Sequence, residues 1–195
     1  MRLYNGPTSP FGRKVAVLYR ELGLAVEEVE IDVYRAEFLD VLNPLRQIPT
    51  LELPTGGAMF DSTVISLYLI ELASRPDVLP EPNKWDILTC CSLCNGLMEA
   101  VLQRRMETLR PEKERSPSVI DKLEVRIRRA VSSLAAALER FNGDQLRLDR
   151  IAAACALDYT SFRFGSEWKE QHPSLAAWCA SHTARPSFEA TRPKA

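Results

Sequence analysis

The first third of the chain shows two different hydrophobic periods. Residues 2–5 predict a short strand, and after a polar loop the apolar residues over 11–22 recur at helical spacing. Gly23 suits the left-handed position just past the end of that helix. Over 26–31, valine and isoleucine alternate with glutamate, which is typical of a strand.

A short helix and a hairpin come next. Residues 36–42 predict the helix, which ends before Asn43-Pro44 because the residue preceding a proline is pushed out of the helical region. Residues 50–53 and 58–60 flank Thr55-Gly56-Gly57, and this pattern predicts a β-hairpin.

A third helix completes the first half. We expect Ser62 to cap it and the helix to run to about Ala73. The order strand, helix, strand, helix, strand, strand, helix is typical of a thioredoxin-like α/β domain, which we place over residues 1–76.

The second half is expected to be all helical. Three prolines in the segment RPDVLPEPNK deny it a helix, so we place a linker over residues 77–84. No convincing strand follows, and helices without a sheet must pack as a bundle, here over residues 85–195. The expected helices are 85–109, 118–141, 149–164 and 173–182.

The composition disfavours several function classes. Of 195 residues, 46% are apolar and 26% charged, as in ordinary soluble globular proteins. The chain has 25 basic and 26 acidic residues, so it lacks the basic excess that nucleic-acid binding requires. No run approaches the ~20 apolar residues of a membrane span, and the start has no secretory signal. We expect a cytoplasmic protein that binds neither nucleic acid nor membranes.

Metal and nucleotide chemistry have few residues available. The only histidines are His172 and His182, and neither a metal-ligand motif nor a glycine-rich phosphate loop is present. The five cysteines suit reduced thiols better than a disulfide framework. The CxxC at 91–94 lies well inside an expected helix, where Cys90 and Cys94 share a buried face, which favours packing over a redox or metal role.

The loop before the first helix is the first candidate site. A thioredoxin-like domain does its chemistry there, but the segment Pro7-Thr8-Ser9-Pro10-Phe11 has no thiol for disulfide exchange. The hydroxyl of Ser9 at a helix start is suited to donate a hydrogen bond to a ligand anion. The alternative is that Ser9 only caps the helix.

Two further segments are candidate ligand sites, and the first of them, at Ile48-Pro49, faces the start of the first helix in a thioredoxin-like fold. A cis bond between Ile48 and Pro49 would turn the backbone of Ile48 outward to pair with an extended peptide. Asp61 and Ser62 stand at the start of the third helix, where the helix terminus suits a ligand carboxylate and Asp61 suits a ligand amino group.

Four segments in this order resemble the cytosolic bacterial glutathione S-transferases, in particular small serine-type members with a TSPF motif after the first strand. They are MRLYNGPTSPFGRKV, NPLRQIPTLEL, FDSTVISLYL and HPSLAAWCASHTARPSFEATRPKA. The likeness covers nearly the whole chain. It implies a homodimer that transfers glutathione, as co-substrate, to an electrophilic small molecule.

The resemblance also implies roles for individual residues. Ser9 would hold the glutathione sulfur, Ile48 before a cis-Pro49 would pair with the cysteinyl backbone, and Asp61 with Ser62 would hold the γ-glutamyl end. Arg35 and Gln47 lie where relatives contact the rest of the peptide, and all seven are glutathione-binding candidates. The competing interpretation is a glutathione-binding protein without catalysis, because a fold and its ligand site can persist without turnover.

The chain departs from this family at one helix start. Relatives begin the helix before IAAACAL with a Ser or Thr cap and an Asp three residues on, whereas this chain reads Arg147-Leu148-Asp149-Arg150. Asp149 or Asp144 is expected to substitute, or the helix to start late.

On the long expected helix, Glu99, Arg104 and Arg105 either border the second-substrate pocket or form an ordinary solvated face.

Overall fold

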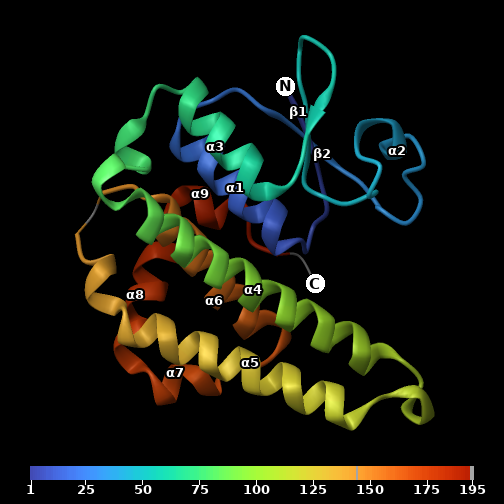
Figure 1. The fold of residues 1–195 in the computed structure, drawn as a ribbon, viewed down its shortest axis with the longest axis vertical. Helices are drawn as coiled ribbons and strands as arrows, with labels where there is room; N and C mark the ends of the chain where they lie inside the picture. Colours follow the sequence, from blue (N-terminus) through green and yellow to red (C-terminus); the bar gives the residue numbers. More distant parts are fainter. Residues whose placement is uncertain (144, 194–195) are drawn as a thin grey trace.

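A computed structural model gives the fold and describes residues 1–143 and 145–193. The first part of the chain is a small sheet with helices, and the rest is helical (Figure 1). The sheet part contains β1 (Arg2–Asn5), α1 (Pro10–Glu21), β2 (Glu27–Glu30), α2 (Leu39–Leu42), β3 (Thr50–Glu52), β4 (Ala58–Met59) and α3 (Ser62–Leu72). The helical part contains α4 (Lys84–Leu109), α5 (Pro117–Ala136), α6 (Leu148–Arg163), α7 (Glu167–Gln171), α8 (Pro173–Thr183) and α9 (Pro186–Glu189).

The strands lie in the order β2-β1-β3-β4. β1 is parallel to β2, while β3 is antiparallel to both β1 and β4, with Tyr4 opposite Thr50 and Leu51 opposite Met59. The ends of β1 and β4 and the beginning of β3 therefore meet at one edge of the sheet. This arrangement confirms the predicted thioredoxin-like domain, followed by a helical one.

Short-range sequence patterns predicted most helices, strands and turns of the sheet part correctly. The first strand has the predicted bounds, and Gly23 takes the expected left-handed backbone with φ of 68°. The hairpin turns through Gly56 and Gly57, whose φ values are also positive. The helix predicted over 36–42 is wrong in its first half, because residues 37 and 38 form a turn and only Leu39–Leu42 is helical.

The helical part differs more from the prediction. The single helix over 118–141 is wrong, since α5 ends at Ala136 and Leu138–Phe141 forms a separate 3₁₀ turn. Prolines do not exclude helical turns from the linker either: Pro76–Val78 and Glu81–Asn83 are 3₁₀ turns, because proline is tolerated in a first turn. We keep residues 77–84 as the proposed boundary between the two domains.

The core centres on α4. It packs against α5 and α6, while α1 packs against α3, α6 and α4, so one core joins the two parts. The segment Pro76–Leu109 is long and apolar enough to span a membrane, with mean hydropathy 1.2, which the sequence count did not single out. Cys91, Leu97 and Val101 on α4 are buried against neighbouring helices, as in the core helix of a globular protein.

Candidate functional site

Three segments of the predicted site meet at one edge of the sheet. They are the loop from β1 to α1, the segment entering β3, and the segment between β4 and α3. Gly6 and Ile48 are in close contact, because a Cβ on Gly6 would lie only 2.8 Å from Cδ1 of Ile48. The backbone N–H of Ser9 in turn donates to the carbonyl of Gly6 at 3.1 Å. The structure therefore places the loop of Ser9 beside Ile48.

Ser9 is the N-cap of α1. Its Oγ accepts a hydrogen bond from the backbone N–H of Gly12 at 3.1 Å, and Pro10 occupies the first helical position, where its missing N–H costs nothing. The side chain is half-buried at the positive end of the helix dipole. A hydroxyl that accepts from an N–H keeps its own proton for donation. Capping and ligand binding are therefore compatible at Ser9.

The loop that carries Gln47 and Ile48 is organised by Asn43, which the sequence reasoning treated only as a helix stop. Asn43 is buried, and its Nδ2 donates to the carbonyl of Gln47 at 2.9 Å and to Oγ1 of Thr50 at 3.1 Å. Oγ1 of Thr50 donates to the same carbonyl at 2.8 Å. The Ile48–Pro49 peptide bond is cis, as the family resemblance implied. The sequence signal that could have indicated this role of Asn43 was its position directly before a proline.

The start of α3 corrects one prediction. Asp61, not Ser62, is the N-cap, because its Oδ1 accepts the backbone N–H groups of Thr63 and Val64 at 2.9 and 3.2 Å. Ser62 is the first helical residue and is buried. A carboxylate is a strong cap, since it accepts from two N–H groups at the positive helix end. Asp61 itself stays exposed to solvent.

Arg35 and Gln47 lie at the margin of this edge. Arg35 is 89% exposed and pairs at 3.5 Å with Asp32, three residues earlier. Gln47 is exposed and directly precedes Ile48. Neither side chain has contacts like the buried hydrogen bonds of Asn43 or the capping hydrogen bonds of Asp61.

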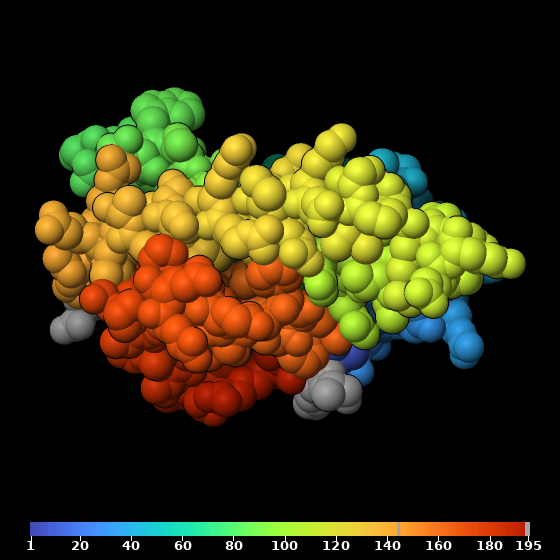
Figure 2. Space-filling view, turned by 90° about the horizontal axis from the view of Figure 1, so that it is seen from below, coloured from blue at the N-terminus to red at the C-terminus, as the bar shows by residue number. Residues whose placement is uncertain are grey.

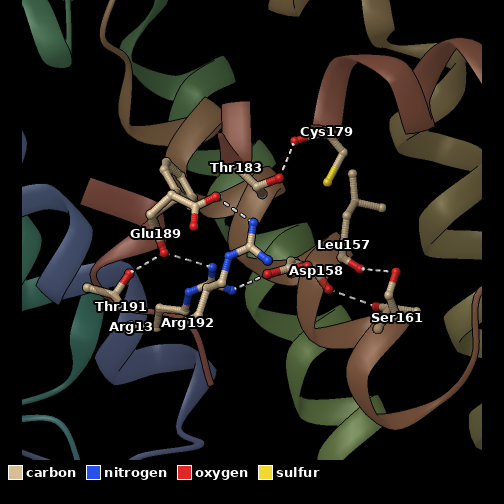
Figure 3. A network of polar contacts seen from close by, with 12 residues as sticks. Arg13, Leu157, Asp158, Ser161, Cys179, Thr183, Glu189, Thr191 and Arg192 are labelled. Atoms are coloured by element: carbon tan, nitrogen blue, oxygen red, sulfur yellow. Dashed lines mark hydrogen bonds and ion pairs between the residues drawn. The ribbon is translucent and has the colours of Figure 1, made fainter. Parts of the chain in front are cut away.

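A hollow of about 250 Å³ lies beside Ser9, and its lining includes residues 190–193 of the C-terminal segment. It includes Arg13 but not Ile48, Asp61 or Ser62. Figure 3 shows Arg13 reaching Asp158 on α6, to which it donates at 2.5 Å. The guanidinium also donates to the carbonyl of Phe188 at 3.4 Å. Arg13 thus fixes α1 to the helical part and to the C-terminal segment.

The cysteines do not form a second site. Cys91 and Cys94 on α4 are buried, and burial raises the pKa of Cys91 to about 12 and that of Cys155 on α6 to about 11. Cys90 is half-buried. The thiols of Cys91 and Cys155 stay protonated and pack in the core. Within residues 1–143 and 145–193, no group of three His, Cys, Asp or Glu side chains is placed to hold a metal ion.

The residues considered for a second-substrate pocket make contacts along α4 and across to other helices. Arg104 pairs with Glu124 of α5 at 3.0 Å and lies over the ring of Phe164. Glu99 accepts from Gln103 on the same helix.

Comparisons with known proteins agree with this geometry. Residues 3–77 match the family model of the glutathione S-transferase N-terminal domain. The chain is 30% identical to the uncharacterized GST-like protein YibF of Escherichia coli, with 99% of this chain and 98% of that protein covered. The chain belongs to the glutathione S-transferase family.

Solved members of the glutathione S-transferase family superpose closely on this chain. A glutathione S-transferase from Methylobacterium radiotolerans, in complex with glutathione sulfonate, has a TM-score of 0.93 and 31% identity, with 100% of this chain and 95% of that one covered. A family member from Pseudomonas fluorescens, with bound glutathione, has a TM-score of 0.89 and 35% identity, with 100% and 99% covered.

At the start of α6, Arg147 and Arg150 stand where the resemblance led us to expect a helix cap and an acidic residue. Arg147 makes no side-chain capping bond and pairs instead with Asp149 at 2.6 Å. Asp149 accepts the backbone N–H of Arg150 at 3.0 Å, so it substitutes in part for the missing cap. Arg150 donates to carbonyls of the preceding loop, at Gly143 and Gln145. The helix does not start late, and Asp144 lies outside the described residues.

Proposed function

We propose that this family member binds glutathione at the described sheet edge and transfers it, as the thiolate, to an electrophilic small molecule. The observation that carries the proposal is Ser9 at the start of α1, with its hydroxyl proton uncommitted and the Ile48 segment alongside. Relatives with 31% and 35% identity are described with glutathione sulfonate and glutathione bound.

In this proposal each part of the tripeptide has a matching partner on the protein. The backbone N–H of Ile48, which no hydrogen bond of the described residues uses, pairs with the cysteinyl backbone beside Pro49. Asp61 receives the γ-glutamyl ammonium, and the start of α3 at Ser62 receives its carboxylate. Arg35 and Gln47 contact the remaining, solvent-facing part of the peptide.

The energetics of one serine are sufficient for thiolate formation. A free thiol has a pKa near 8.5, and lowering it by about two units requires ~2.7 kcal/mol. One hydrogen bond to a charged sulfur supplies about 1.5–3 kcal/mol, and a helix terminus adds about 0.3–1 kcal/mol. No cysteine is needed at Ser9 for this chemistry.

The test is the pH dependence of conjugation in wild type and in Ser9→Ala. Losing the hydrogen bond should lower turnover at neutral pH about 10- to 100-fold and raise the apparent pKa of bound glutathione, while affinity stays within a few-fold. Ser9→Cys should gain thiol-exchange activity. A Ser9→Ala enzyme with the wild-type pH profile would sink the role of Ser9, and saturable binding without turnover on any electrophile would identify a binding protein.

We also propose that the protein is a cytoplasmic homodimer. The supporting feature is a hollow of about 810 Å³ between α4 and α5, whose apolar lining includes Leu93, Leu97 and Val125. Figure 2 shows α5, in yellow, running across the face of the molecule seen from below, beside the later helices. Residues 1–84 have 8 basic and 12 acidic groups and residues 85–195 have 17 and 14, so the two parts carry opposite charge.

Sedimentation at micromolar protein should give about twice the monomer mass of 22.0 kDa. A monomer at every concentration would remove the dimer proposal.

A further inference from the structure

A buried lysine lies where three helices of the two domains meet. Lys14 of α1 is 1% exposed, and its Nζ donates to Oδ1 of Asn95 on α4 at 2.9 Å. Within the described residues, no carboxylate forms an ion pair with it. A buried ammonium held by a neutral amide is unusual, because burial of an unpaired charge is costly.

The contacts of Asn95 lead from this lysine to the start of α3. Nδ2 of Asn95 donates to Oγ1 of Thr63 at 3.1 Å, and the backbone N–H of Thr63 donates to Oδ1 of Asp61 at 2.9 Å. The chain of hydrogen bonds thus connects α1, α4 and the cap of α3. In Figure 1, α1 lies next to both α3 and α4.

We propose that Lys14 is a positioning residue whose buried ammonium gives the start of α3 its affinity for a ligand carboxylate, without touching the ligand. The inference rests on the proposed function, in which the γ-glutamyl carboxylate binds at Ser62. Asp61 places a negative charge at that same helix start and opposes a second carboxylate there. Lys14 supplies the compensating positive charge from behind the helix, through protein that excludes water and screening ions.

The groups that face Lys14 come from each element around it. They are Asp61 before α3, Cys91 and Cys94 of α4, and Cys155 of α6. Burial keeps the thiols of Cys91 and Cys155 protonated, and a hydrogen bond with Cys90 together with burial does so for Cys94. Asp61 is therefore the charged group among them, and burial lowers the pKa of Lys14 while Asp61 opposes that shift.

The first experiment measures calorimetric affinity for two ligands, glutathione and 4-aminobutanoyl-cysteinylglycine, which lacks only the γ-glutamyl carboxylate. Lys14→Met should weaken glutathione binding about three- to tenfold and leave the analogue within about twofold, since one charge interaction is lost. Lys14→Arg should retain glutathione affinity. Lys84→Met, which changes the first residue of α4, is the matched control.

Equal losses for both ligands, or no loss for either, would overturn the role of Lys14. A wild-type protein that binds neither ligand at millimolar concentration would instead remove the proposed function.

A second experiment decides the question even where Lys14→Met does not fold. Arginine keeps its charge at every accessible pH, whereas Lys14 loses its proton below the usual lysine range. The ratio of the glutathione dissociation constants, wild type over Lys14→Arg, should rise as the pH increases toward 10.5, the usual pKa of lysine. The ligand's own titrations cancel in this ratio. A constant ratio contradicts the proposal.

Discussion

Two consecutive residues of α1 bury a cation in opposite ways. Arg13 is 5% exposed in its side chain and pairs with the carboxylate of Asp158 at 2.5 Å, and it also donates to the carbonyl of Phe188. Lys14 points to another side of the helix and has a neutral partner, Asn95. One position neutralises its charge and anchors the helical domain, while the other leaves positive charge beside the sheet edge at which we propose that glutathione binds.

The difference matches the chemistry of the two side chains. Guanidinium is always charged and forms directional pairs with carboxylates, so it suits a structural anchor. An ammonium loses its proton more readily when buried, and burial lowers the pKa of Lys14. Adjacent positions on one helix thus serve stability and ligand electrostatics separately.

The largest effect is expected from Asp158→Ala. The change leaves Arg13 buried without its carboxylate, and it should lower the free energy of unfolding by about 2–3 kcal/mol, reduced from the cost of a fully buried pair because Asp158 is a third exposed. Urea denaturation measures this. Glu81→Ala, which breaks the exposed pair with Lys84, should cost under about 0.5 kcal/mol. Similar losses in the two variants would contradict the anchoring role.

A smaller loss is expected from Asn95→Leu. It removes the hydrogen bond that satisfies the Lys14 ammonium and the link to Thr63, so the free energy of unfolding should fall by about 1–3 kcal/mol. Gln103→Leu, on the same helix with an exposed partner, is the control. An unchanged urea midpoint would show that Lys14 needs no polar partner.

Lys14→Met should change stability by no more than about 1 kcal/mol, because relief of the buried charge offsets the acceptor left unpaired on Asn95. Combined with Asn95→Leu, it should recover stability relative to Asn95→Leu alone, since both polar partners are then gone. Thermal and urea unfolding of wild type, the two single variants and the double variant give the double-mutant cycle. A double variant less stable than either single one would argue against a buried charge at this position.

The smallest expected effect is a dependence of the free energy of unfolding on pH. The pKa of Lys14 is lower in the folded state than its usual 10.5. Between the folded-state pKa and 10.5 the unfolded chain binds more protons than the folded chain, so the contribution of Lys14 to the free energy of unfolding rises with pH up to about 10.5. The free-energy difference between wild type and Lys14→Met should therefore shift in favour of wild type over this alkaline range. A difference independent of pH would mean that Lys14 is not buried as a cation.

The sequence by itself determined the local elements and the family. Helical spacing over 11–22, alternation over 26–31 and the glycines of the hairpin each act within a few residues, so they located α1, β2 and the β3–β4 turn. Segments such as NGPTSPFGRKV carried the resemblance to the glutathione S-transferase family, and the comparisons confirmed that family. The roles assigned to Ser9, Ile48 and Ser62 stay predictions.

Tertiary structure decided which distant residues meet. Asp61 rather than Ser62 caps α3, and neither periodicity nor spacing distinguishes two adjacent polar residues at a helix start. Packing of helices and loops decides which partners meet: Arg13 with Asp158, Lys14 with Asn95, and Asn43 with the Ile48 loop. In the sequence the members of the first two pairs lie far apart, and nothing marks them as partners. Periodicity reports which face of an element is buried, whereas the partner of a buried charge follows from the packing of whole elements.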